Sequence, residues 1–374
     1  MEKLESYIEF LKYCLDTSRP IPASVATINW HDLLEFAQKQ SIVGIFWQGI
    51  NSPSALNNFY GNKPTDDDVM EWMGEAHLLQ MQSKLVDEKA AWVAGNFKQE
   101  GFKSCLLKGQ GIALLYPNPA LRTSGDIDIW VAPMKASGSQ EEDVEAVLSY
   151  CRKFVPDTKA CYHHIDFRNA GEISVEVHYR PSWASCPWHN QRLQKYFFGC
   201  FSSVHPSSDE KSILLDSGKG FFYPDFEFNV IFLLHHIYRH ALYEGIGLRQ
   251  IIDYYYLLFS NKGVNKAKLA KQLAYFGMQK IASGISWILV EILGLKEDYM
   301  IVAPNAKYGR IIWDDIIEGG NFCKYSSDQP SASGTYLHNL KRIKKDLKML
   351  SYFPAECLWE PWFRIWHWAW RKRH

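Results

Sequence analysis

One short segment constrains the fold of this chain more than any other, residues 126–131 (DIDIWV), in which acidic and apolar residues alternate. Because successive side chains of a β-strand point to opposite faces, the pattern predicts a half-buried strand with Asp126 and Asp128 on one face and Ile127 and Ile129 on the other. Two carboxylates in one small volume repel each other unless a cation lies between them, and hard oxygen ligands suit Mg²⁺. The segment therefore predicts a metal site on a sheet.

A third carboxylate follows in residues 174–178 (SVEVH), where Glu176 lies between two valines. On a neighbouring strand, Glu176 would complete a set of three acidic groups that can hold two Mg²⁺ ions. Such a set clamps the attacking and leaving oxygens of a displacement at phosphorus. We therefore predict Asp126, Asp128 and Glu176 as catalytic and metal-binding residues, with Asp166 as the next candidate for the third carboxylate.

The residues before this strand predict a phosphate-binding turn. Residues 103–107 have the composition of a short buried strand, and Gly109 and Gly111 open a brief helix that ends before Pro117. Backbone N–H groups and the positive end of that helix could then approach a phosphate. Lys108 and Arg122 would add positive charge, although either could instead pair with a nearby acidic residue.

These motifs together resemble a known superfamily. A strand, a Lys-Gly turn, a short helix, Leu-Tyr-Pro, Arg and then Asp-Ile-Asp-Ile is similar to the DNA polymerase beta type nucleotidyltransferases. More narrowly, the chain resembles a bacterial family of uncharacterised nucleotidyltransferases related to AbiEii-type toxin enzymes. The shared features include residues 176–179 (EVHY) and 245–253 (GIGLRQIID), and the resemblance covers roughly residues 30–260.

The resemblance implies a metal-dependent enzyme that transfers a nucleotidyl group from a nucleoside triphosphate to an unidentified acceptor (small molecule, protein or RNA) and releases pyrophosphate. It places Lys108, Gly109, Gln110 and Arg122 at the nucleotide. The superfamily commonly has Gly-Gly or Gly-Ser at the turn, whereas Gln110 follows Gly109 here. We expect the Gln110 amide to replace the serine as a donor to phosphate. The alternative is a catalytically inactive protein of the same fold that binds a nucleotide or a partner.

A phosphotransferase of the aminoglycoside-kinase kind is a third class with a two-domain α+β fold. It would require a His-x-Asp catalytic loop with a downstream Asn, and no segment supplies one at the right place.

The patterning predicts an α+β fold, in which a small α+β core (101–181) lies between an N-terminal helical region (1–100) and a mainly helical C-terminal domain (182–374). The resemblance implies that this core is a mixed-sheet nucleotidyltransferase unit. The sheet signals are the alternating runs 162–168 and 173–179, joined by a turn at 169–171. Apolar residues at three-to-four spacing predict helices: 7–15, 30–48, 69–99, 141–154, 226–243, 248–259, 266–275, 282–293 and 337–350.

The helical domain would supply the acceptor side of the cleft. His236 and His240 share a helix face, and a Gly-Ile-Gly turn brings Arg249 round to the same side, so we predict all three as acceptor-binding residues. The spacing of the histidines also occurs in zinc sites, but the glutamate of a zinc-protease motif is missing. Hydrogen bonding within the helical domain is the plain alternative, and Arg249 could form a structural ion pair with Asp253.

Composition sets further limits. Lys plus Arg and Asp plus Glu number 41 each, so any polyanion must be bound by a local patch. The eight cysteines form no CxxC pair, and the first residues lack the layout of a signal peptide, which predicts free thiols and a cytoplasmic protein. We expect no membrane span. Five tryptophans among basic residues in 359–374 are compatible with an interfacial membrane helix or a nucleic-acid platform, but docking onto the core is the favoured interpretation.

Overall fold

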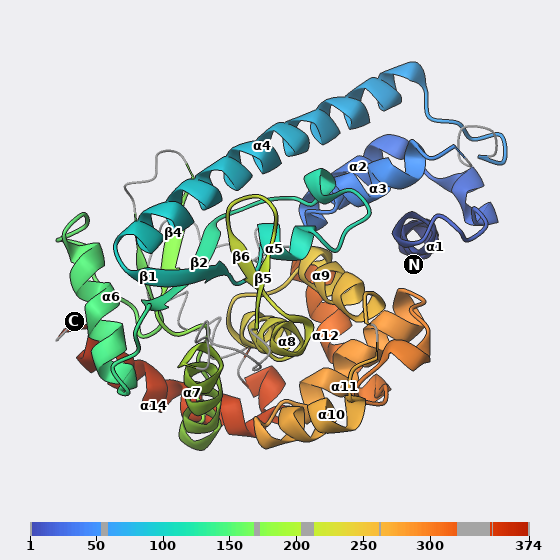
Figure 1. Ribbon diagram of the computed structural model, residues 1–374. Helices are drawn as coiled ribbons and strands as arrows, with labels where there is room; N and C mark the ends of the chain where they lie inside the picture. Colours follow the sequence, from blue (N-terminus) through green and yellow to red (C-terminus); the bar gives the residue numbers. More distant parts are fainter. Residues whose placement is uncertain are drawn as a thin grey trace, which may run out of the picture.

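The computed structural model describes residues 2–53, 59–167, 173–202, 213–261, 263–319, 345 and 347–372. It has the expected α+β architecture, with one small mixed sheet among many helices (Figure 1). The seven cysteines in these segments are free thiols. None of the helices in these segments combines the length and the apolar character needed to cross a bilayer.

The sheet has four strands in the order β1-β2-β4-β3. Their bounds are β1 Phe102–Leu106, β2 Ile127–Pro133, β3 His164–Asp166 and β4 Val175–His178. Strand β2 pairs antiparallel with β1 and parallel with β4, and β3 pairs antiparallel with β4. All four predicted strands are therefore confirmed, while the predicted turn at 169–171 lies outside the described residues.

One face of the sheet is apolar and covered by two helices, α4 (Asp66–Gln99) and α6 (Gln140–Arg152). Ile127, Ile129 and Val177 belong to the same buried cluster as side chains of both helices. Figure 1 shows α4 running along the sheet. A capping box in which Thr65 and Asp68 bond each other's backbone N–H groups begins this helix. The opposite face of the sheet is left for the polar residues of the alternating strands.

Helices before and after the sheet share a second hydrophobic core. Phe10 and Phe46 from the N-terminal helices lie in the same cluster as Tyr256 and Leu257 from a C-terminal one. The helices are α1 Glu2–Leu15, α2 Trp30–Gln40, α3 Val43–Ile50, α5 Gln110–Ala113, α7 Pro187–Ser202, α8 Phe226–Tyr243, α9 Leu248–Phe259, α10 Lys266–Tyr275, α11 Gln279–Trp287 with a π-helical turn at Ile288–Ile292, α12 Ala306–Gly319 and α14 Pro354–Arg371. The predicted boundaries of the N-terminal region, the core and the C-terminal domain remain predictions.

Two strands occur in a segment for which the sequence predicted no particular element. β5 (Leu214–Asp216) and β6 (Phe222–Pro224) form a hairpin within the predicted helical C-terminal domain, next to β1 and α5. Strands of three residues are too short for an alternating pattern to reveal them. Most of the predicted helix 337–350 lies outside the described residues.

A buried ion pair joins the loop before β2 to α9. The Arg122 guanidinium donates from Nε and Nη2 to the two carboxylate oxygens of Asp253, each at 2.7 Å, and the Tyr116 hydroxyl donates to the same carboxylate at 2.7 Å. Arg122 and Asp253 are each only 5% exposed. Such a pair holds two segments together because separating them would leave a buried charge uncompensated.

Asp253→Ala should lower the free energy of unfolding by about 3–5 kcal/mol, since it leaves the buried Arg122 unpaired. Tyr116→Phe, which removes one hydrogen bond from the same carboxylate, should lower it by about 1 kcal/mol. Urea unfolding followed by circular dichroism measures both. A loss for Asp253→Ala no larger than that for Tyr116→Phe would show that this pair does not hold α9 in place.

Candidate active site

Acidic side chains form a row across the polar face of the sheet. Strand register places Asp128 opposite Glu176, and Glu176 opposite Asp166. Two residues further along β4, His178 is paired with Trp130 of β2 on one side and with His164 of β3 on the other. Because residues two apart share a face, the carboxylates and histidines form one continuous polar surface. Two of the carboxylates predicted to bind a metal, Asp128 and Glu176, therefore share this face with histidines.

Asp128 is the most buried member of the row, with 4% of its surface exposed. Its Oδ1 lies 3.0 Å from His178 Nε2, and its Oδ2 lies 3.1 Å from Lys108 Nζ. His178 Nε2 also lies 3.3 Å from the Glu176 carboxylate. Two cationic groups, one from the turn after β1 and one from β4, thus compensate the buried carboxylate.

These contacts shift the ionisation of the cluster. Burial opposes the charge on Glu176 and Asp128, but the hydrogen bond from His178 to Glu176 and the Lys108 charge beside Asp128 prevail, so the pKa of Glu176 falls to about 2 and that of Asp128 is lowered. Burial would lower the pKa of His178, yet its bonds to Asp128 and Glu176 raise it to about 9. Burial, with His178 as the next cause, lowers the pKa of His164 to about 4. At neutral pH, His178 is therefore a cation and His164 is neutral.

The turn after β1 brings Lys108 to this cluster. Leu107 N donates to the Asp128 carbonyl at 3.0 Å, which continues the sheet pairing up to the turn. Gly109 has φ +59° and ψ −118°, a conformation that favours glycine. Gly111 is required for a different reason, because a Cβ there would come within 2.8 Å of Tyr223 in β6. The first glycine shapes the turn, and the second allows the hairpin to pack.

A narrow pocket lies between this part of the sheet and helices α8 and α9. From the sheet side it is lined by Lys108, Gly109, Arg122, Gly125, Asp126 and Asp128, and from the helices by Leu233, His236, Ile237, Arg249, Gln250 and Asp253. The stacking of Trp130 on Phe228 of α8, with ring centroids 5.4 Å apart, shows that α8 covers the polar face. The structure thus brings most of the predicted nucleotide and acceptor residues into one pocket.

Three of the predicted residues do not line this pocket. Gln110 turns to α4, where its amide nitrogen donates to the Ser83 carbonyl at 3.2 Å, and its oxygen accepts from Ser124 Oγ at 2.9 Å. The structure therefore does not support the expected role of Gln110 as a phosphate donor, because its amide already bridges α4 and the loop before β2. His240 lies behind His236 and pairs with Glu244 at 2.8 Å. Glu176 lies outside the pocket lining. It is connected to Asp128 by His178, whose Nε2 lies 3.3 Å from the Glu176 carboxylate and 3.0 Å from that of Asp128.

Arg122 lines the pocket, but its guanidinium already pairs with Asp253. Arg249 also lines it, and its Nη1 donates to the Thr123 carbonyl at 3.3 Å. Burial, and the neighbouring Arg122 charge after it, lower the pKa of Arg249. Burial likewise lowers the pKa of His236, so its imidazole is neutral at pH 7. The wall formed by α8 and α9 thus presents the Arg249 cation and the neutral His236, with Gln250 also in the lining.

The sequence analysis did not assign a site role to His164, His178 or Arg239. The alternation that places Glu176 on the polar face also places His178 there, so the two histidines could have been inferred from strand register. Arg239, on α8, lies 4.8 Å from the Trp183 ring, and Glu244, Glu176 and Asp128 are among the charges that act on it. No local pattern in the sequence identifies Arg239, because its position depends on how α8 crosses the sheet.

Four groups of side chains in the described residues could hold a metal ion, and two of them contain carboxylates of this row: Asp128, Glu176 and His178, and then His164, Asp166 and Glu176. Within each group, one ligand atom per residue lies within 4.8 Å of the others. Carboxylate oxygens from two strands fit a hard cation, and the imidazoles could extend the set to softer metals. Asp126 lines the same pocket from the start of β2 and is in neither group.

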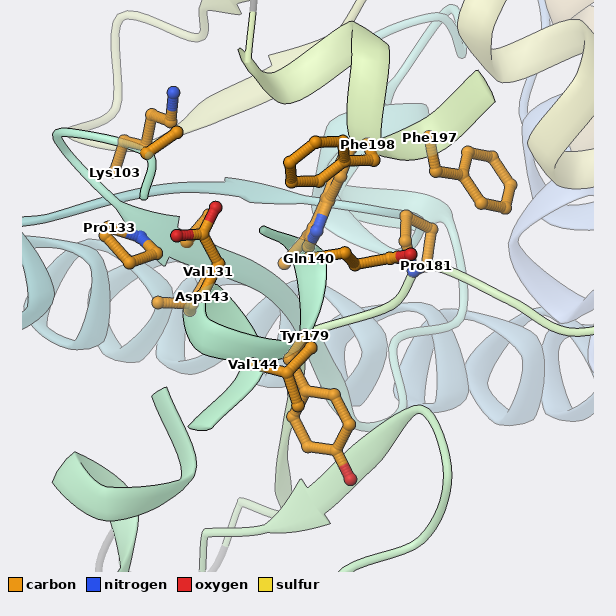
Figure 2. A pocket seen from close by; sticks show the side chains of 13 residues that line it. Lys103, Val131, Pro133, Gln140, Asp143, Val144, Tyr179, Pro181, Phe197 and Phe198 are labelled. Atoms are coloured by element: carbon orange, nitrogen blue, oxygen red, sulfur yellow. The ribbon is translucent and has the colours of Figure 1, made fainter. Parts of the chain in front are cut away.

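A second pocket lies where β1, β2, α6 and α7 meet (Figure 2). Its charged lining residues are Lys103 and Asp143, and aromatic and aliphatic side chains make up most of the rest. It contains none of the carboxylates of the polar row. The pocket at Asp128 is therefore the one equipped for chemistry on a charged substrate.

The pocket combines three cationic side chains (Lys108, Arg122 and Arg249) with three carboxylates (Asp126, Asp128 and Asp253) beside a small mixed sheet, a combination suited to a metal ion and phosphate oxygens. The comparisons agree with this class of protein. Residues 26–294, which include every residue of the pocket, match the family described as "Uncharacterised nucleotidyltransferase". The chain belongs to this family, and a nucleoside triphosphate is the substrate that such a family implies. No curated protein and no solved structure matches the chain.

The raised pKa of His178 predicts a pH-dependent stability. The folded state binds more protons than the unfolded state between the ordinary pKa, 6.5, and about 9. The contribution of His178 is thus complete below pH 6.5 and is lost as the pH rises through 9. From pH 6.5 to 9 in EDTA, the free energy of unfolding should fall more in the parent than in His178→Gln, by on the order of 1–3 kcal/mol.

Urea unfolding at both pH values tests this difference. His31→Gln, which changes an exposed histidine on α2, is the matched control and should follow the parent. Equal falls for the parent and His178→Gln would contradict the assigned ion cluster.

Proposed function

We propose that this protein is a metal-dependent nucleotidyltransferase that transfers a nucleotidyl group from a nucleoside triphosphate to an acceptor hydroxyl and releases pyrophosphate. The observation that carries the proposal is the single pocket in which Asp126 and Asp128 lie beside Lys108 and Arg249. Membership of the family and the resemblance to the DNA polymerase beta type superfamily both support it.

Asp126, Asp128 and Glu176 would hold the metal, for which Mg²⁺, as two ions, is our choice. When bound, the ions would neutralise the triphosphate and polarise the phosphorus under attack. Lys108 and His178 already surround Asp128 with positive charge, so a divalent ion would compete with them for the same oxygens. We therefore expect Lys108 to be released towards the phosphates when the ion binds.

The cationic lining would bind the triphosphate. Lys108 and Arg249 approach the pocket from opposite walls, and the Gly109 backbone forms its edge. Polyphosphates are bound by such combinations of point charges, guanidinium forks and backbone N–H groups. Arg122 would act by holding α9 in place through Asp253, so that Arg249 faces the nucleotide at a fixed distance.

Glu176 would act on the acceptor side of the site. The acceptor oxygen forms a bond to the α-phosphorus, the bond from that phosphorus to the pyrophosphate oxygen breaks, and the acceptor proton passes to a base. A carboxylate with a pKa of about 2 is ionised at neutral pH and is a weak base. Glu176 therefore fits the role of a metal ligand that positions the acceptor, and neutral His236 fits a hydrogen bond to it.

Asp126→Asn should abolish Mg²⁺-dependent binding of a nucleoside triphosphate with little change in stability, because the amide keeps the shape of the side chain and loses its charge. Titration calorimetry with each of the four triphosphates, with and without Mg²⁺, measures this. Asp143→Asn, at a buried aspartate outside the pocket, is the matched control and should bind as the parent does. Unchanged binding by Asp126→Asn would contradict the proposed metal site.

Glu176→Gln should retain triphosphate binding but lose most of the turnover, by about 10²-fold or more, because it affects the acceptor rather than the nucleotide. Labelled triphosphate incubated with cell extract fractionated into small molecules, RNA and protein provides the assay. Label should move to an acceptor from the α-phosphate and not from the γ-phosphate.

Three results would change this conclusion. Transfer of the γ-label would indicate a phosphotransferase. Binding without transfer to any fraction would favour the alternative, a non-catalytic nucleotide-binding protein of the same fold. Full turnover by Glu176→Gln would move the third carboxylate elsewhere, with Asp166 next in the row.

A further inference from the structure

Helix α14 lies at the periphery of the molecule, beyond α7 (Figure 1). It docks by one face only, so the docking predicted for the tryptophan-rich tail is confirmed for that face. Phe363 stacks on Trp183 with ring centroids 4.0 Å apart, and Trp370 approaches the Tyr162 ring at 6.1 Å. His367 Nε2 accepts from Tyr162 N at 3.1 Å. These contacts fix which side chains of the helix point away from the protein.

The docked face carries the acidic residues of the helix. Glu356 is 5% exposed and accepts hydrogen bonds from the backbone of Ser185 and Cys186 at 2.6 and 3.2 Å. Glu360 is 2% exposed. Neither carboxylate therefore contributes to the outer surface.

The outward face is apolar, which is the reverse of an ordinary surface helix. Its large side chains are between 59% and 65% exposed: Leu358, Trp362, Ile365 and Trp368. Trp366, which is 45% exposed, lies at the edge of this face and contacts the Tyr162 ring at 5.1 Å. Trp188 of α7, itself 51% exposed, lies beside them against Trp359. Several exposed large apolar side chains on one helix face make that face a candidate binding surface.

Cations lie at the C-terminal end of this face. Arg371 and Lys372 are exposed, and Lys372 Nζ lies 3.6 Å above the Trp368 ring. Arg364, with 43% of its side chain exposed, is a third cation on the helix and pairs with the buried Glu360 at 3.8 Å. Since the whole chain has a formal net charge of zero, this concentration of positive charge without an exposed carboxylate on α14 is a local property.

We propose that the outward face of α14 binds the surface of an anionic lipid bilayer. Tryptophan prefers the boundary between lipid and water, because its ring is apolar and its N–H is polar. Helices that lie in this boundary combine such side chains with Lys and Arg that contact lipid phosphates. The surface is separate from the nucleotide pocket, so the inference does not depend on the proposed function.

The test is flotation of the full chain with vesicles of phosphatidylcholine alone or with one quarter phosphatidylglycerol. We expect the parent to float with the anionic vesicles and to bind neutral vesicles less. About 0.5 M NaCl should release it, because salt at this concentration screens surface charge. Leu358→Ser/Trp362→Ser/Ile365→Ser should partition at least about tenfold more weakly.

The matched control is Met81→Ser/Leu85→Ser/Trp92→Ser, which removes three comparably exposed apolar side chains from α4 and should float as the parent does. Arg371→Glu/Lys372→Glu should lose the preference for anionic vesicles while keeping its circular dichroism spectrum and Tm, since both side chains point outward.

Four outcomes would overturn the proposal. In the first, the parent does not float. In the second, the parent binds both kinds of vesicle equally and charge reversal does not change this binding. In the third, the α4 control loses flotation, and in the fourth, the parent dimerises through this face. Sedimentation equilibrium detects the last case as a dimer that the α14 triple variant abolishes. Binding of single-stranded RNA in place of vesicles, lost on charge reversal, would likewise assign the surface to a nucleic acid.

Discussion

The burial of Asp128 is the constraint on which the site depends. Moving a carboxylate out of water costs several kcal/mol unless opposite charge and hydrogen bonds compensate it. Here the compensation comes from two places, the turn after β1, which carries Lys108, and strand β4, which carries His178. The glycine at position 109, the continuation of sheet pairing to Leu107 and the parallel register of β2 with β4 all bring those cations to the same carboxylate.

Periodicity in the sequence was enough for the parts of the fold that are long and regular. The predicted bounds of α8, α9 and α10 agree with the structure, and the alternation in 126–131 correctly separates the two faces of β2. The hairpin β5–β6 has strands of three residues and gave no such signal. Residues 26–294 match the family on which the resemblance relied, whereas α14 lies beyond that range.

Contacts between distant segments could not be read from local pattern. The motifs predicted the position of Lys108, Asp126 and Asp128 on one pocket, because they depend on a single strand–turn–strand unit. The pairing of Arg122 with Asp253 joins residues 131 positions apart, whereas the sequence had suggested Arg249, four residues before Asp253, as the partner of that carboxylate. Gln110 was assigned to phosphate from its place in the motif, but the position of α4 determines where its amide points.

The Arg122–Asp253 pair also limits how the pocket can move. It connects the loop at the base of the sheet wall to α9, which carries the opposite wall, and it lies at the pocket's lining. A hinge that swung α9 away would have to break this pair and solvate both ions. The pair therefore fixes the distance between the sheet and α9 on the two sides of the pocket. The fixed separation of the two walls limits the thickness of any molecule that binds between them.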